Sequence, residues 1–336
     1  MRLREDLEQY EIQHLSEFAC KSAYSRGRRK DEEKCDLRTV FQRDRDRIIH
    51  SKAFRRLMHK TQVFLAPEGD HFRTRLTHTL EVSQISRTIA RALGLNEDLT
   101  EAIAMGHDLG HTPFGHSGER YLDAIYPKGF KHNEQSLRVV DYLEKRQNTY
   151  GMNLTEEVRD GILNHTGDAA PFTLEGQVVK FSDRIAYINH DIDDAIRAGI
   201  IKEADLPKDC IQMLGKTHRE RINNLVVDIV KNSEGQPKII MSNNMLYHSN
   251  KLRAYMFENV YYSNIVKKDE EMDKIQNIIE KLYFYYKKNP EKLPQEYYPM
   301  IDEWGIDEIV KDQIAGMTDR YAINIYTQLF IPKGWK

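Results

Sequence analysis

Apolar residues recur at helical spacing along most of the chain. Between residues 77 and 94 they fall four or five positions apart, and a glycine ends the pattern. Asn96 is a candidate N-cap for a following helix, because two acidic residues would occupy its first turn and Gly106 would end it. The pattern predicts two helices in succession, joined by a short loop.

The same periodicity continues toward the middle of the chain. Residues 155–165 read as a helix that begins at a Thr155 cap, and residues 174–199 read as a long helix that closes on a glycine. Strand-like alternation is scarce, and the best candidate is the short stretch GQPKIIMS at 235–242. The sequence therefore predicts a mainly α fold, without internal repeats.

Helical patterns fill most of the length, and no low-complexity linker divides them. The chain has 336 residues, enough for one large domain or two smaller ones. We expect a helical extension at 1–34, a core at 35–205 and a C-terminal helical portion at 206–336 that packs on the core.

Composition and charge narrow the class of protein. Lys and Arg number 50 against 52 for Asp and Glu, so no global basic field indicates nucleic acid. The cysteines, Cys20, Cys35 and Cys210, are too few and too scattered for a disulfide framework, which favours a reducing compartment. The charged N-terminus lacks the apolar segment of a signal peptide, and no apolar run approaches the roughly 18 residues of a membrane span. We expect a soluble cytoplasmic protein without a membrane partner.

Candidate chemistry gathers in the stretch MGHDLGHTPFGHSGE, residues 105–119. It holds three histidines, an aspartate and a glutamate in one glycine-broken loop. His107 and Asp108 are adjacent where a helix is predicted to end, and neutral imidazole and ionised carboxylate are ligands of divalent metals. Two ligands do not make a site, so partners must come from elsewhere.

Two partners for this pair are suggested by their local context. His78 stands at the start of the helix that follows RTRLT, and Asp183 lies in the predicted long helix. Taken singly, His78 reads more readily as a capped or packed histidine, and a His-Asp pair is common by chance. The order H…HD…D, with each member beside an amphipathic helix, is far more specific.

These motifs resemble those of the HD phosphohydrolase superfamily. The resemblance is carried by RTRLTHTLEV, MGHDLGHTPFGHSGE and VVKFSDRIAYINHDIDDA. More narrowly, RDRDRIIHSKAFRRLMHKTQV, FKHNEQSLRVV and DQIAGMTDRYAINIY resemble the bacterial deoxyguanosinetriphosphate triphosphohydrolase-like proteins. This resemblance implies an HD-type helical fold over roughly residues 35–330 and an enzyme that releases inorganic triphosphate from a deoxynucleoside triphosphate (dNTP). The metal ligands it implies are His78, His107, Asp108 and Asp183.

The candidate residues for proton transfer lie in the same loop, 105–119. His111, His116 and Glu119 are the candidates, because histidine titrates near neutrality and a neighbouring carboxylate orients and charges an imidazole. Which of the two histidines acts stays open, and His116 could instead fix the turn by a bond to a backbone carbonyl. By resemblance, His132 is a further histidine near the phosphates.

One face of the predicted long helix offers a second group of candidates. Asp183, Tyr187 and Asp191 are spaced i, i+4 and i+8, so they line one side of the helix. Tyr187 could pack on a deoxyribose, or it could be an ordinary core aromatic; Asp191 could accept the 3′-OH proton. By resemblance, Gln62 lies near the sugar.

A triphosphate also requires cations. The pool comprises Arg55, Arg56, Lys60, Arg75, Lys251 and Arg253, and most of these could equally be solvated surface charges. Arg75 lies three residues before His78, at the same predicted helix start. The segment KLRAY, which contains Lys251, Arg253 and Tyr255, resembles a family segment that closes over the substrate.

The expected cofactor is a divalent metal ion, Mn, Mg or Fe, with Co or Ni also compatible. The expected partners are a dNTP and, by resemblance, further copies of the chain in a homo-oligomer. The alternatives are an HD-type phosphohydrolase of nucleoside monophosphates, cyclic nucleotides or guanosine tetraphosphate, and a nucleotide sensor or single-stranded nucleic-acid-binding protein. For single-stranded DNA, the stretch KLYFYYKKNPEK at 281–292 could stack bases, although a buried helix end is the simpler interpretation.

Overall fold

The computed structural model describes residues 3–62, 73–146, 149–261 and 269–332. As predicted, the fold is mainly α: these residues form 16 α-helices and one short antiparallel hairpin, β1 (Lys145–Arg146) with β2 (Thr149–Tyr150). Among the helices described, none has the length and apolar character that crossing a membrane would require.

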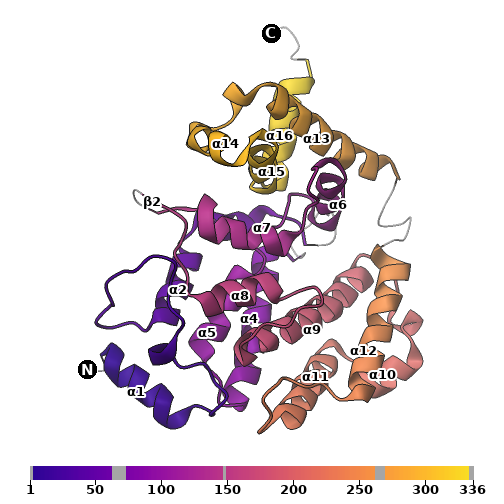
Figure 1. Cartoon of the computed structure of the whole chain (residues 1–336). Coiled ribbons are helices and arrows are strands. Elements are labelled where there is room, and N and C mark those ends of the chain that lie inside the picture. Colours follow the sequence, from indigo (N-terminus) through magenta and orange to yellow (C-terminus); the bar gives the residue numbers. More distant parts are fainter. Residues whose placement is uncertain (1–2, 63–72, 147–148, 262–268, 333–336) are drawn as a thin grey trace.

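The larger of two apolar cores runs from Ala19 to Val260 and is built around α4, α5 and α9, which pack against one another. Figure 1 shows these helices in the lower body of the molecule. The helices of this part are α1 (Arg4–His14), α2 (Val40–Ile49), α3 (Lys52–Arg56), α4 (Arg75–Ala92), α5 (Glu97–Gly106), α7 (His132–Arg138), α8 (Glu156–Asn164), α9 (Leu174–Arg197), α10 (Lys208–Leu214), α11 (His218–Ser233) and α12 (Asn243–Met256).

A second apolar core joins the C-terminal helices to one helix from the middle of the chain. Its members are α6 (Gly115–Ile125), α13 (Asp269–Lys288), α14 (Tyr298–Trp304), α15 (Ile306–Ala315) and α16 (Asp319–Phe330). In Figure 1 the C-terminal helices gather at the top, above α6 and α7. The loop between α5 and α6 therefore passes from the first core to the second. Helices α10 to α12, which follow the predicted boundary at 205/206, share the first core with the helices before it. The boundary itself stays a prediction.

Side-chain caps mark where α5 and α9 begin, and the first of them was predicted. The side chain of Asn96 accepts a hydrogen bond from the Leu99 amide at the start of α5, and Thr173 does the same for Gly176 at the start of α9. Thr155 precedes α8 as predicted, but its hydroxyl does not cap that helix. It donates instead to the buried carboxylate of Asp44, at 2.7 Å.

The strand predicted at 235–242 is wrong. This segment is irregular, and its backbone amides donate to side chains of the neighbouring helices rather than to a strand. Ile239 donates to the side chain of Gln177 at 3.1 Å, and Ile240 to the hydroxyl of Ser233 at 2.8 Å. The buried side chains of Ile239 and Met241 produce the alternation that looked like a strand.

The aromatic stretch in α13 belongs mostly to the second core. Tyr283 and Tyr286 are buried, and the Tyr283 hydroxyl donates to Asp307 at 2.5 Å. Phe284 is exposed and Tyr285 is half-buried. Two of the four rings are therefore occupied by packing and are not free to stack on bases.

Candidate active site

Three packed helices bring the candidate metal ligands together. His78 is in the first turn of α4, Asp183 lies in α9, and His107 and Asp108 directly follow α5. Ligand atoms of His78, His107 and Asp108, all buried, lie within 4.8 Å of one another. Oδ1 of Asp183 lies 3.0 Å from Nε2 of His78 and 3.7 Å from Nε2 of His107.

The donor set of this cluster fits a divalent metal ion. Nδ1 of His107 lies 2.7 Å from the carbonyl oxygen of Ala104, so its proton is donated there and Nε2 keeps its lone pair. That Nε2 atom is buried and has no hydrogen-bond partner among the described residues. With metal–ligand distances of about 2.1 Å, adjacent octahedral ligands lie about 3 Å apart, close to the separations observed here. The cluster could therefore hold an ion.

Buried charge surrounds this cluster. The guanidinium of Arg75 lies 3.0 Å from Asp108, and both side chains are buried. Burial alone would raise the pKa of Asp108, but His107, His111 and Arg75 hold it well below its usual range. The pKa of Asp183 is likewise lowered, against the effect of burial, by its hydrogen bond with His78 and the proximity of His107. Both carboxylates are ionised, as metal ligation requires.

The loop histidines form a group of their own beside the cluster. The rings of His111 and His132 stack with centroids 4.0 Å apart. Glu119 Oε1 accepts hydrogen bonds from both the backbone amide and Nδ1 of His132, each at 2.9 Å. His116 is 3.8 Å from Glu119, and its side chain is 68% exposed. The carboxylate of Glu119 is thus closer to His132 than to either histidine of its own motif.

This arrangement sets the protonation of the loop histidines. Burial lowers the pKa of His132, but the hydrogen bond and charge of Glu119 more than reverse this, so the pKa is raised. Burial, with Arg75 and His132 nearby, lowers the pKa of His111 well below its usual value. Of the two stacked rings, His132 is therefore the one that holds a proton more strongly.

The opposite wall comes from α9 and the end of α12. The hydroxyl of Tyr187 accepts a hydrogen bond from Nε of Arg253 at 2.6 Å, and the hydroxyl of Tyr261 donates to Asp191. Burial raises the pKa of Asp191 to about 7, although the bond from Tyr261 opposes this. This wall offers hydroxyl, carboxyl and guanidinium groups beside an aromatic ring.

Most of the predicted site residues meet in one cavity, which encloses about 630 Å³ including its open mouth. Those that line it are Gln62, Arg75, His78, Asp108, His111, His116, His132, Asp183, Tyr187, Asp191 and Arg253. His107 and Glu119 do not line the cavity but contact groups that do.

Two predicted residues of the KLRAY segment lie outside this set. Lys251 is exposed on α12, and its ammonium group lies 2.6 Å from Asp209. Tyr255 is half-buried and packs on the first core. Helical geometry explains the separation, because residues two apart on a helix do not face the same side. Only Arg253 of this segment is brought to the cavity.

Several cavity residues escaped the sequence analysis. Tyr261, Phe257 and Thr166 line the cavity. The buried ring of His165 lies 5.0 Å from that of His107 and 5.4 Å from that of His132. Nine of the 13 histidines, His165 among them, lie between residues 59 and 190, and this clustering could have pointed to it. Tyr261 had no such indication, because its approach to Asp191 depends on how α12 packs on α9.

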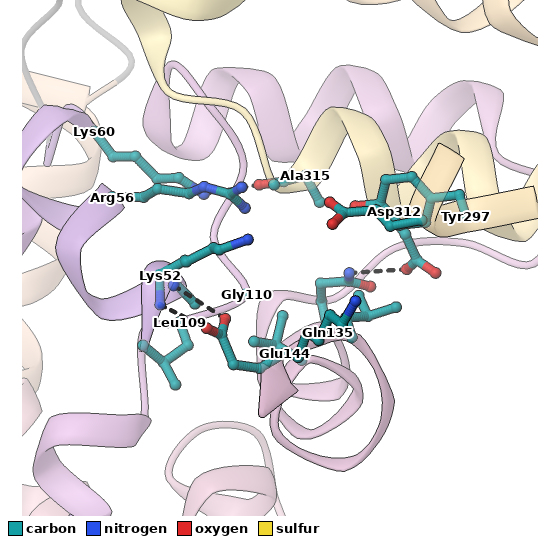
Figure 2. Close-up of a pocket in the computed structure, with 16 residues that line it drawn as sticks. Lys52, Arg56, Lys60, Leu109, Gly110, Gln135, Glu144, Tyr297, Asp312 and Ala315 are labelled. Atoms are coloured by element: carbon teal, nitrogen blue, oxygen red, sulfur yellow. Dashed lines mark hydrogen bonds between the residues drawn. The ribbon is translucent and has the colours of Figure 1, made fainter. Parts of the chain in front are cut away.

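A second cavity lies between the two cores, and its lining contains two members of the predicted cation pool but none of the predicted metal ligands or proton-transfer residues. Its lining includes Lys52, Arg56, Lys60, Gln135 and Asp312. Figure 2 shows Lys60 reaching across it to the carbonyl of Ala315, a hydrogen bond of 2.7 Å. Arg56 and Lys60, two members of the predicted cation pool, thus face this cavity, whereas Arg55 donates to the carbonyl of His50.

Comparison with known proteins assigns this helical site to a class. The family model of the HD domain matches residues 75–188, which contain all four His and Asp residues of the candidate metal cluster. A second family model, the phosphohydrolase-associated domain, matches residues 239–328. The protein is an HD-domain phosphohydrolase, and HD domains bind divalent metals.

The relatives define the family within this class. A protein of Caldanaerobacter subterraneus subsp. tengcongensis is 58% identical over 335 residues, covering 100% of this chain and 98% of the relative. One from Clostridium perfringens is 51% identical over 342 residues, covering 99% of each. Both carry the name deoxyguanosinetriphosphate triphosphohydrolase-like protein, and the chain belongs to that family, as its motifs predicted.

A solved structure supports the fold. A hypothetical protein from Aquifex aeolicus matches with a TM-score of 0.51 at 20% identity, covering 86% of this chain and 68% of that one. At this identity the match supports only the helical architecture.

Proposed function

We propose that the protein hydrolyses deoxynucleoside triphosphates to a deoxynucleoside and inorganic triphosphate, with a divalent metal ion. The names of the relatives suggest this reaction. The observation that carries the proposal is the composition of one cavity, where a His/Asp cluster, stacked histidines and a Tyr/Asp wall face the same space. This matches a substrate with an anionic end and a sugar end.

The phosphate end binds at the His/Asp cluster. His78, His107, Asp108 and Asp183 hold the ion, which when bound supplies positive charge that polarises a phosphoryl oxygen. Arg75, held by Asp108 at the cavity wall, adds a second fixed positive charge for the triphosphate. The buried Asp108–Arg75 contact keeps both groups in place before the substrate arrives.

Proton transfer falls to the stacked histidines. Water attacks the α-phosphorus and gives up a proton, the bond from the α-phosphorus to the 5′-oxygen breaks, and the 5′-oxygen takes up a proton. His132, whose pKa Glu119 raises, donates that proton, and His111, whose Nδ1 has no hydrogen-bond partner among the described residues, accepts one from water. His116, exposed at the mouth, is left to contact phosphate.

The sugar end rests on α9. The ring of Tyr187, fixed by Arg253, packs on the deoxyribose, and Asp191 hydrogen-bonds to the 3′-OH. Gln62, buried at the cavity edge, supplies an amide to the same region. This arrangement selects a nucleoside with a free 3′-hydroxyl.

A panel of dNTPs with Mn²⁺, Mg²⁺ or Co²⁺, scored for inorganic triphosphate, tests the proposal. We expect triphosphate from at least one dNTP, and its loss in His107→Ala. His50→Ala, an exposed histidine away from the cavity, serves as the matched control. Release of orthophosphate or pyrophosphate would contradict the proposal and point to the other HD substrates named above.

The predicted partners extend this proposal. We expect a homo-oligomer, measurable by light scattering. Binding of single-stranded DNA is the weaker expectation, because Tyr283 and Tyr286 are buried. A gel shift at low salt decides it, and binding there that weakens as salt rises would support contact with the phosphate backbone.

A further inference from the structure

One carboxylate of the C-terminal region reaches the loop beside the candidate active site. Asp319 is the first residue of α16. Its Oδ1 accepts the backbone amide of Phe114 at 2.9 Å, and its Oδ2 accepts the amide of Thr61 at 3.0 Å and also the Thr61 hydroxyl. Both oxygens are therefore engaged with segments more than 200 positions away in sequence, whereas Thr318 caps α16.

The two segments that Asp319 holds both lead into the cavity. Thr61 immediately precedes Gln62, and Phe114 lies between His111 and His116. Phe114 has a φ of 64°, a left-handed conformation that costs a non-glycine residue free energy and persists only where its surroundings fix it. The Asp319 carboxylate is one such constraint, because it accepts the amide of this very residue.

Lys60 makes a parallel connection in the interior. Its buried ammonium group donates to the carbonyls of His111 and Ala315. Its own carbonyl accepts the amide of Arg75, the residue that begins α4, at 3.2 Å. Figure 2 shows this side chain spanning from its own segment to the C-terminal helices. The loop is thus held at His111 as well as at Phe114.

We propose that Asp319 is a positioning residue for the reaction. Together with Lys60 and Thr61 it forms a clasp between the C-terminal helices and the loop His111–His116, and this clasp fixes the loop histidines over the substrate. Asp319 contacts neither substrate nor metal and acts through the backbone of Phe114 and Thr61. The expected effect on kcat rests on the proposed function, whereas the expected effect on the position of the loop does not.

The clasp predicts which functions depend on Asp319 and which do not. The candidate metal ligands lie on α4, on α9 and directly after α5, and these helices are held by the first core, so metal affinity does not depend on the clasp. The loop histidines do depend on it. Misplacement of a reacting group by about 1 Å costs up to roughly a hundredfold in rate, so kcat is the sensitive quantity.

The test compares Asp319→Asn with Asp307→Asn in the full-length protein. Asn keeps the shape of the side chain, but one carboxylate oxygen becomes an NH₂ group, which cannot accept the amide of Phe114 or Thr61. Asp307 is a matched control, because it lies in the first turn of α15, and its carboxylate contacts Tyr283 and Lys287 instead of the loop.

Three measurements are needed: kcat and KM for triphosphate release, the Kd for Mn²⁺, and hydrogen–deuterium exchange of peptides covering residues 109–122 and 97–106. For Asp319→Asn we expect kcat to fall by roughly tenfold or more, Mn²⁺ affinity to stay within about twofold, and exchange to rise in the first peptide only. For Asp307→Asn we expect all three to match the parent protein. Retained Mn²⁺ affinity also shows that the variant is folded.

The outcomes separate the clasp from the proposed function. If the parent protein releases triphosphate and Asp319→Asn keeps its kcat, the clasp is wrong. If the parent releases none, the proposed function is wrong, and the exchange data judge the clasp alone. Faster exchange confined to residues 109–122 would then support it, and unchanged exchange would overturn it.

Discussion

Replacing Glu119 by Gln tests how the loop sets the protonation of His132. Glu119 accepts two hydrogen bonds from this residue, one from the backbone amide and one from Nδ1, each at 2.9 Å. Gln can still accept the backbone amide, but it no longer supplies a negative charge beside the ring. The expected effect is therefore on the proton affinity of the imidazole rather than on its position.

The magnitude follows from the lost charge-assisted bond. Such a bond contributes about 1.5–3 kcal/mol, and 1.36 kcal/mol corresponds to a factor of ten in proton affinity. The pKa of His132, which Glu119 raises, should thus fall in Glu119→Gln, with a loss of proton affinity of about 10- to 100-fold. A general acid is active below its pKa, so the alkaline limb of the rate profile should move to lower pH by the same amount. At a pH above both pKa values, kcat should fall by about 10- to 100-fold.

The assay is triphosphate release from a dNTP with saturating Mn²⁺ between pH 5.5 and 9. Glu134→Gln is the matched control, because this exposed residue is on the same helix as His132 and forms an ion pair with Lys131 instead of His132. It should leave the profile in place. An alkaline limb that stays at the same pH in Glu119→Gln would refute the assignment of His132 as the proton donor.

Three further substitutions test other parts of the structure. Burial raises the pKa of Glu175 from 4.5 to about 7, so the folded protein loses stability as pH rises from 4.5 to 7. Glu175→Gln has no carboxyl to ionise, so the difference in unfolding free energy between variant and parent should shift in favour of the variant by about 3 kcal/mol from pH 4.5 to pH 8. Urea unfolding measures this difference, and equal values at both pH values would contradict the prediction. Gly110→Ala would place a Cβ 2.2 Å from the Ser136 amide nitrogen. The clash should lower the free energy of unfolding by about 1–3 kcal/mol, and with it the melting temperature and the activity. An unchanged melting temperature would show that the loop has room there. Arg253→Met removes the donor to the Tyr187 hydroxyl and should raise KM for the dNTP more than it lowers kcat. Lys251→Met is the control, because Lys251 is on the same helix but contacts Asp209, and it should leave KM unchanged. Equal effects of the two substitutions would show that Lys251 also contacts the substrate.

Three of the four cluster residues stand beside a recognisable helix boundary, whereas Asp183 lies inside α9. His107 and Asp108 follow the glycine that ends α5, and His78 follows the Thr cap that begins α4. Local rules of capping and periodicity therefore determine where these side chains start. Those rules do not say which helices pack together. The order of the motifs and the family resemblance were what grouped the four candidate metal ligands into one site.

The residues that the sequence did not reveal depend on contacts between distant segments. Tyr261 reaches Asp191 from a helical turn 70 positions later, and Asp319 reaches Phe114 across 205. No spacing rule connects such pairs, since they meet only after two cores have formed. The false strand at 235–242 has the same origin, because burial beside helices imitates the alternation of a sheet.

The loop between α5 and α6 joins two parts of the molecule whose stabilities need not be equal. The candidate metal ligands are anchored in the first core, whereas the ring of Phe114 is buried in the second. If the second core loosens first on heating, the loop histidines are released while the ion stays bound. Catalysis would then fail at a lower temperature than metal binding, and a heated sample would contain molecules that carry the ion but do not turn over. The thermal limit of the enzyme would be that of its C-terminal helices.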